Sequence, residues 1–570
     1  MRTNRKIRPG KDLTAELKRL SRKDFLRLGG AGMAGAAMLG TAGCGVFGGS
    51  QGGNGGGGGG GGGNSIAINL YDTIADLNST TTTDGVSSDV LLNVMEGLYR
   101  LDENTHPQPA VAEGVEISDD QLSYTFTLRD GVKWSDGSAV TAKDFEYAWI
   151  RALDPDTAGQ YAFIIGQFVE GGTEFNLGEG SREDVGIRAT DDKTLEVQLA
   201  LPAPFFLSLT SFYTYYPQKQ SFTEEQGDDY AQSPKALLYN GPYTLTSFNP
   251  TQGVTLVKND NYWNAENVDI QKVEARIVKE LETAVNLYES GQLDVQVLNV
   301  AQYVEEYKDS PEFHAQIRFV TYYLSFNYGE PIFQNENIRR AFQTGYDRDA
   351  LVNQIINDGS VSATGFVPEG MAANGGDEQT FREVQGPVLP EFDAEEAKKL
   401  FQQGVEEVGE NPTIELLAYD ISSSRDIATF LQDQFEKNLG AKVDVNVQPF
   451  DRKLELEADG EFQLSWQAWI GDYNDSMTFL DLYLSDNAFN TGKYANDRYD
   501  ELITQAQEEP DAAARLEIMQ EAERLLVEED AGAGPMFFDY DSNLIKPNIK
   551  NFVDHPYGGG IDISLWRLEG

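Results

Sequence analysis

The sequence predicts a mixed α/β protein built from more than one lobe. The chain has 570 residues, which is too long for one small core and long enough for about two or three packed lobes. Hydrophobic residues make up 40% of it, as expected of a globular body. Strand and helix patterns alternate from about residue 65 to the end.

Two segments show the alternation of a half-buried strand. Residues 122–128 alternate Leu, Tyr, Phe and Leu with Ser and Thr, and residues 195–199 alternate Leu, Val and Leu with Glu and Gln. One face of each segment is therefore apolar and the other polar, which predicts strands of sheets with one solvated face.

Three segments have the pattern of a helix. Thr141 and Asp144 have the spacing of a capping pair at a helix start, ahead of the aromatic residues 145, 147 and 149. Residues 281, 285 and 288 share a helical face, and Gly291 can end that helix in a left-handed turn. The apolar residues 516, 519, 522 and 526 predict a late amphipathic helix.

The N-terminal segment has the features of an export signal. Residues 1–27 are basic, and an apolar run of about 15 residues follows, shorter than the roughly 20 that cross a bilayer. Residues 21–27 (SRKDFLR) resemble the twin-arginine export motif, and residues 41–44 (TAGC) resemble a lipobox. We therefore expect 1–44 to be an export signal and Cys44, the single cysteine, to carry a lipid anchor.

The segment 45–64 is mostly glycine and predicts a flexible tether. A phosphate-binding loop would need Gly-Lys-Ser/Thr at its end, and this segment ends Gly-Asn-Ser. The tether would join the lipid-bearing Cys44 to a folded body that starts near Ser65.

The charge of the chain excludes one class of partner. The net charge is −48, although the first 44 residues hold ten Lys or Arg and only three acidic residues. The body is therefore even more acidic than the whole and repels nucleic acid and anionic headgroups. Two explanations of the acidic composition are solubility and a calcium-binding site, but the sequence contains no calcium-binding loop motif.

Sequence motifs of catalysis are missing from the body. It has no G-x-S-x-G elbow and no H-E-x-x-H motif, and the three histidines lie far apart. We therefore predict no catalytic set, no metal site and no cofactor. A pair of carboxylates of the glycosidase kind remains open, because many acidic residues pair by chance.

One segment, Trp466–Asp475 (WQAWIGDYND), concentrates chemistry-bearing residues. Gly471 would let another backbone approach closely. Asp472 lies between aromatic residues, where a desolvated carboxylate requires a cation. The alternative is that both tryptophans are core residues and that Asp472 caps a turn.

Several stretches in a fixed order resemble the oligopeptide/dipeptide-binding family, family 5, of the solute receptors of ABC importers. The likeness runs from about residue 66 to the end. These stretches are VMEGLY (94–99), PQPAVAE (107–113), YTFTLRDGVKWSDG (124–137), VTAKDFEYAW (140–149), NGPYTL (240–245), YYLSFN (322–327) and NIRRAF (337–342).

The resemblance implies a periplasmic-binding-protein-like fold: a two-lobed clam with three domains and a hinge. The implied boundaries are 65–97, 216–321 and 540–570 for domain I, 98–215 for domain II and 322–539 for domain III.

The resemblance also implies a ligand site. In peptide-binding members, an Asp in a Trp-x-x-Asp-Tyr motif takes the ligand's α-ammonium group, and here that residue is Asp472. The backbone of Ala468 and Ile470, between Trp469 and Gly471, would pair with an extended peptide. The weaker correspondences are Asp84, Tyr161 and Asn490. Trp466 is a departure, because it stands where some members carry an Arg. Tyr161 and Tyr323 either line the cleft or are ordinary packing residues.

The resulting hypothesis is a monomeric, lipid-anchored receptor that delivers short peptides to an ABC permease whose ATPases supply the energy. It binds no nucleic acid and meets the membrane only through its anchor. The same fold binding an oligosaccharide or a metal chelate is the alternative. Two alternatives belong to other classes of protein. A tethered hydrolase is disfavoured because the sequence lacks catalytic motifs. A sensory surface protein that binds a ligand without transporting it cannot be distinguished from an importer receptor by sequence.

Overall fold

The computed structural model describes residues 64–373, 379–420, 422–485, 487 and 489–569. The predicted export signal with Cys44 and the predicted tether, apart from Asn64, lie outside these residues.

An 11-stranded mixed sheet runs through the molecule in the order β15-β14-β16-β12-β17-β11-β1-β10-β9-β8, with β13 paired to β17. Its strands are β1 (Ser65–Leu70), β8 (Tyr243–Asn249), β9 (Gly253–Lys258), β10 (Lys272–Ile277), β11 (Val295–Leu298), β12 (Phe313–Phe326), β13 (Val361–Ser362), β14 (Thr413–Tyr419), β15 (Lys442–Gln448), β16 (Leu464–Ile470) and β17 (Ala533–Ile545).

Strands β12 and β17 connect the two halves of this sheet. Residues 313–317 of β12 pair with 540–544 of β17, next to β11. After a register shift, residues 321–325 pair with 533–538, and β12 continues into its pairing with β16. The predicted boundaries at 321/322 and 539/540 fall beside this shift. Such an irregularity bends and twists a strand pair.

A second, antiparallel sheet of four strands has the order β4-β5-β7-β6, and two strand pairs, β2–β3 and β18–β19, stand apart. The four-stranded sheet lies wholly inside the predicted segment 98–215. The strands are β2 (Tyr99–Leu101), β3 (Pro107–Pro109), β4 (Ala112–Ile117), β5 (Ser123–Leu128), β6 (Ile187–Ala189), β7 (Thr194–Gln198), β18 (Ile549–Lys550) and β19 (Arg567–Leu568).

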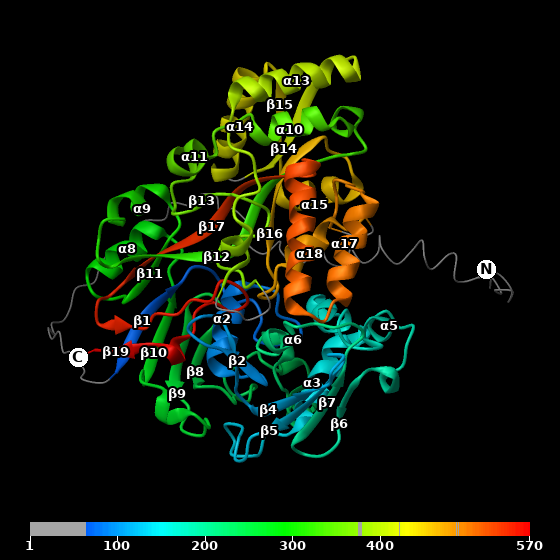
Figure 1. Ribbon diagram of the computed structural model, residues 1–570. Helices are drawn as coiled ribbons and strands as arrows, with labels where there is room; N and C mark the ends of the chain where they lie inside the picture. Colours follow the sequence, from blue (N-terminus) through cyan, green and yellow to red (C-terminus); the bar gives the residue numbers. More distant parts are fainter. Residues whose placement is uncertain (1–63, 374–378, 421, 486, 488, 570) are drawn as a thin grey trace, which may run out of the picture.

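Helices cover the sheets in three regions (Figure 1). Helices α10, α13 and α14 lie with β14 and β15 at one end of the molecule, α8 and α9 lie beside β11, and α3 and α5 lie with the small sheet. The helices are α2 (Gly85–Val94), α3 (Ala142–Leu153), α4 (Phe163–Gly166), α5 (Gly172–Asn176), α6 (Phe206–Leu209), α7 (Gln220–Gln226), α8 (Leu281–Glu289), α9 (Ala301–Tyr307), α10 (Glu336–Thr344), α11 (Arg348–Ala350), α12 (Phe381–Gln385), α13 (Ala394–Val408), α14 (Ser422–Leu439), α15 (Phe450–Asp459), α16 (Met477–Leu480), α17 (Asp497–Glu508) and α18 (Ala512–Arg524).

The local sequence patterns predict these elements correctly. Strand β5 buries Tyr124, Phe126 and Leu128 and turns its Ser and Thr outward. Helix α3 starts after Thr141, whose N–H donates to the Asp144 carboxylate at 2.8 Å. Helix α8 is followed by Gly291 with φ +73°. The predicted mixed α/β, two-lobed class is therefore confirmed.

The two ends of the described chain meet at α2. The Asn93 side chain donates to the carbonyl of Ile561 at 2.7 Å and accepts from the N–H of Ile563 at 3.0 Å. The Asp89 carboxylate accepts from the N–H of Gly560 at 2.8 Å. The C-terminal segment is thus built into the core around the first helix of the body.

Candidate functional site

Strand β16 has one paired edge and one free edge. Gly471 donates its N–H to the carbonyl of Phe319 at 2.7 Å, and the register continues through Trp469 opposite Thr321. Hydrogen-bonded and non-hydrogen-bonded pairs alternate in an antiparallel ladder. Ala468 and Ile470 therefore direct their N–H and C=O groups away from β12.

Within the described part of the chain, no strand covers that outward edge at Ala468 and Ile470. Strand β14 pairs with β16 only at Leu464 and Ser465. Among the described residues, Ala468 and Ile470 have no backbone partner on this side, and the Ile470 side chain is 58% exposed. An exposed edge of this kind is a template for one more strand.

Asp472 follows this edge directly. Its N–H donates to Thr478 Oγ1 at 3.2 Å, which fixes the turn after β16. Burial raises the pKa of its carboxyl group to about 7. Its carboxylate forms no ion pair among the described residues, so it is a desolvated acid that a cation would stabilise.

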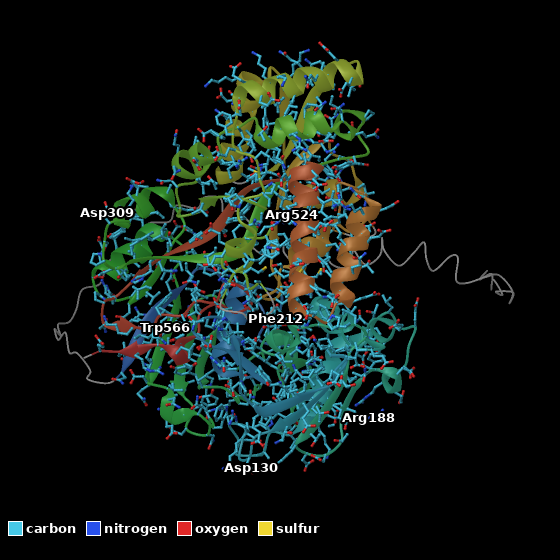
Figure 2. The ribbon with its side chains drawn as sticks, viewed as in Figure 1. Asp130, Arg188, Phe212, Asp309, Arg524 and Trp566 are labelled. Atoms are coloured by element: carbon cyan, nitrogen blue, oxygen red, sulfur yellow. The ribbon has the colours of Figure 1, made fainter. Side chains whose placement is uncertain are left out.

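Two tyrosines from the predicted domain II face Asp472. The rings of Tyr161 and Tyr213 lie 5.9 Å apart, and their hydroxyl groups are hydrogen-bonded. Burial raises the pKa of both phenols, and the negative charge of Asp472 raises it further. Phe212, which packs against Tyr161 with ring centroids 5.7 Å apart, lies near the centre of the molecule (Figure 2).

Asp84 approaches the same place from the start of α2. Its Oδ1 accepts from the N–H of Ser87 at 2.8 Å and caps the helix. Its Oδ2 is buried without a hydrogen-bond partner among the described residues. The Asp84 charge acts on the Tyr213 phenol together with that of Asp472. Three predicted site residues, Asp84, Tyr161 and Asp472, are therefore brought together from three distant segments.

Tyr473 joins this motif to the other lobe. Its ring stacks on Phe205 with centroids 4.0 Å apart and an interplanar angle of 6°, and it meets Phe168 edge-on. Asp475, two residues further, forms a bidentate ion pair with Arg515 of α18 at 2.7 and 2.8 Å. The position of Asp472 is thus fixed by buried contacts on both sides.

Trp466 and Tyr323 are core residues of the β16–β12 region. Trp466 is 2% exposed and packs against Tyr322 and Tyr419. Tyr323 is also buried, and its hydroxyl donates to Gln467 at 3.1 Å. Trp466 is therefore a core residue, as one of the two interpretations of the motif predicted. A contact of Trp466 or Tyr323 with a ligand stays a prediction.

Trp469 is half-buried, and its ring lies 5.0 Å from that of Phe489, which is exposed. Its Nε1 has no hydrogen-bond partner among the described residues. Asn490 is buried, and its amide hydrogen-bonds to the backbone of Leu484 and Tyr494 within its own loop. The structure does not place Asn490 with the group around Asp472.

The close approach expected at Gly471 is made by side chains rather than by a backbone. A Cβ at this position would lie 3.1 Å from Phe479, 3.2 Å from Met371 and 3.3 Å from Phe319. A larger residue would displace the packing under Asp472.

Sequence reasoning missed two residues of this site, Tyr213 and Asp481. Tyr213 lies in an aromatic run (FYTYY, 212–216) that reads as core. Asp481 stands after the buried Phe479 and Leu480, where an acidic residue in an apolar stretch is the available signal.

Two features of the described residues concern metal ions and membranes. Within the part of the chain that the structure describes, no three His, Cys, Asp or Glu side chains are grouped to hold a metal ion. No helix of that part is long and apolar enough to cross a membrane.

The fold and the site define a two-lobed binding protein whose parts meet at an aromatic contact beside the carboxylates of Asp84 and Asp472. A family model described as "Bacterial extracellular solute-binding proteins, family 5 Middle" matches residues 106–491. The chain belongs to this family of bacterial extracellular solute-binding proteins. The predicted family is therefore confirmed.

Two relatives from Bacillus subtilis are peptide-binding proteins by name. The chain is 34% identical to the dipeptide-binding protein DppE of Bacillus subtilis over 475 residues, 83% of this chain and 86% of the relative. It is 31% identical to the oligopeptide-binding protein OppA of the same organism over 528 residues, 90% of this chain and 94% of the relative.

Solved structures agree with the sequence matches. The substrate-binding domain of an oligopeptide ABC transporter from Bacillus anthracis superposes with a TM-score of 0.73 at 36% identity, covering 89% of this chain and 99% of that one. OppA of Listeria monocytogenes bound to peptide gives a TM-score of 0.72 at 33% identity, with 89% and 100% covered.

Proposed function

We propose that the protein captures short peptides in a cleft between its lobes and delivers them to the permease of an ABC importer. The observation that carries the proposal is the combination at the end of β16. A free strand edge at Ala468 and Ile470 runs directly into Asp472, a largely buried carboxylate that forms no ion pair among the described residues. An extended peptide would pair with the edge, and its α-ammonium group would pair with Asp472.

This arrangement explains how different peptides could share one site. Main-chain hydrogen bonds to Ala468 and Ile470 do not depend on the ligand's side chains, and the ammonium group is common to all unblocked peptides. Side chains would point away from the pairing plane into space that water can fill. The two lobes would close over the peptide by bending at β12 and β17, where the register shift makes the strand pair irregular.

The names of the relatives support the same ligand class. Both Bacillus subtilis relatives are named for dipeptide or oligopeptide binding, and the Listeria structure holds a peptide. In this proposal the protein is not an enzyme, acts as a monomer and is held at the outer face of the membrane through a lipid on Cys44. Cell fractionation of a Cys44→Ser variant tests the anchor, because the variant should leave the membrane fraction.

Thermal unfolding tests the ligand class. The purified protein is stripped of carried-over ligand by partial unfolding and refolding, and is then heated with peptides of two to six residues, each with a free or an acetylated N-terminus. A ligand at 100 times its Kd adds about 2.7 kcal/mol to stability. Free-amine peptides should raise the melting temperature, whereas acetylated peptides should not.

The control is an Asp472→Asn variant, which keeps the size of the side chain and removes its charge. It should lose the distinction between free and acetylated peptides. If no peptide of either kind stabilises the wild-type protein, the peptide assignment is wrong, and oligosaccharides and metal chelates become the next ligands to test on this fold.

A further inference from the structure

Asp481 is a second carboxylate beside Asp472. Thr478, whose hydroxyl accepts from the Asp472 N–H, lies three residues before Asp481 in the continuous helical segment 477–483. Residues three apart on a helix share a face, so Asp481 lies on the face that meets Asp472. Like Asp472, Asp481 keeps part of its surface exposed.

The guanidinium group of Arg515 already has a partner. Arg515 binds both carboxylate oxygens of Asp475, and this pair is buried. Neither Asp472 nor Asp481 forms an ion pair among the described residues, and Asp84, from α2, forms none either. Burial, together with the negative charges of Asp472 and Asp475, raises the pKa of Asp481 to about 8.

A ligand with one ammonium group has one positive charge for two neighbouring carboxylates, Asp472 and Asp481. One α-ammonium group satisfies Asp472 and leaves Asp481 desolvated beside it. A buried carboxylate without a cation costs free energy unless it takes up a proton. A lysine or arginine as the first residue brings a second cation on a flexible stem from the same α-carbon, so one ligand residue can meet both carboxylates.

We propose that the site prefers peptides whose first residue has a basic side chain, and that Asp481 is the residue that binds this second charge. The inference rests on the proposed peptide function and adds the class of ligand. A peptide with a neutral first residue still binds through Asp472 and the β16 edge, but more weakly.

Isothermal titration calorimetry with two matched tetrapeptides tests the preference. One begins with lysine and the other with norleucine, which has the same four-carbon stem without the charge, and both continue with three alanines. Wild-type protein should bind the lysine peptide at least about tenfold more tightly, as expected for one desolvated charge pair. Equal affinities would overturn the proposal.

The variant Asp481→Asn should bring the ratio of the two affinities close to one. The control variant is Asp309→Asn, which removes one charge from an exposed position at the periphery beside α9 (Figure 2) and should keep the wild-type ratio. If Asp481→Asn keeps the lysine preference, Asp481 does not bind the second charge and the proposal fails.

A measurement on the wild-type protein alone guards against a variant that does not fold. Titrations at pH 7 in two buffers with different ionisation enthalpies report the protons exchanged on binding. The lysine peptide should release more protons than the norleucine peptide, because its side chain displaces a proton from Asp481. Equal release by both would contradict the proposal. If neither peptide binds at all, the peptide function itself is wrong, which is a different result from binding without preference.

Discussion

At the scale of single residues, the site depends on a carboxylate that titrates near neutral pH. Burial holds the pKa of Asp472 at about 7 in the ligand-free protein, and only the ionised form attracts an ammonium group. We therefore expect the affinity for free-amine peptides to fall as the pH decreases from 7 to 5, by up to about tenfold per pH unit. Calorimetry across this range measures the effect.

The variant Asp472→Asn is the control for this pH dependence, because its amide does not titrate. Its weaker binding should change much less between pH 7 and pH 5. A fall of the wild-type size in the variant would show that another group controls the acid limb, and the neighbouring Asp481 would be the first to examine.

The candidate site contains some residues that the sequence predicts and others that it does not. Asp472 could be predicted because it stands in a short motif with Trp469 and Tyr473. Tyr213 carries no local motif, since its proximity to Asp472 arises only from folding, and the signal for Asp481 is only an acidic residue in an apolar stretch. Asn490 has a matching position in the family, yet its amide is occupied by its own loop.

At the scale of elements, the free edge of β16 leads to a prediction about backbone hydrogen bonds. Ala468→Pro removes an N–H group that points away from β12, so the pairing with β12 remains and stability should change little. Peptide binding loses one main-chain hydrogen bond and should weaken about fivefold to tenfold. Calorimetry and thermal unfolding measure the two effects separately.

The neighbouring position provides the matched comparison. Gln467 belongs to a hydrogen-bonded pair with Tyr323 of β12, so Gln467→Pro removes a hydrogen bond inside the sheet. This variant should lower the melting temperature markedly, because proline is poorly tolerated within a sheet. If Ala468→Pro destabilises the fold as much as Gln467→Pro does, the assignment of the outward edge is wrong.

Elements differ in how clearly the sequence predicts them. Strands β5 and β7 belong to a sheet with one solvated face, so their residues alternate strictly. Strand β12 is buried on both faces over most of its second half. Strand β17 is buried on both faces over most of its first half. Their sequences therefore lose the alternation, and only the family resemblance indicated a boundary there.

At the scale of the whole molecule, buried acids make stability depend on pH. Burial raises the pKa of a set of carboxyl groups above the usual value near 4, so the folded protein binds protons that the unfolded chain releases. These groups are Asp89, with a pKa of about 6, Asp472, Asp539 and Asp554, each about 7, and Asp481, about 8.

The free energy of unfolding should therefore increase as the pH falls from 8 towards 5, and the net charge of −48 acts in the same direction by reducing self-repulsion. Asp562 does not oppose this trend: burial alone would raise its pKa, but Arg100 lowers it well below the usual range, so it stays ionised throughout. Calorimetric unfolding of ligand-free protein at pH 5 and pH 8 measures the difference. A lower melting temperature at pH 5 would contradict the expectation.

The hydrogen bonds between α2 and the last residues of the chain also determine when the body can fold. Asn93 and its partners Ile561 and Ile563 are separated by 468 and 470 residues. A growing chain that has not yet reached residue 560 lacks the partners of these buried groups, so its first helix cannot reach its final packing. The chain therefore completes its first lobe last.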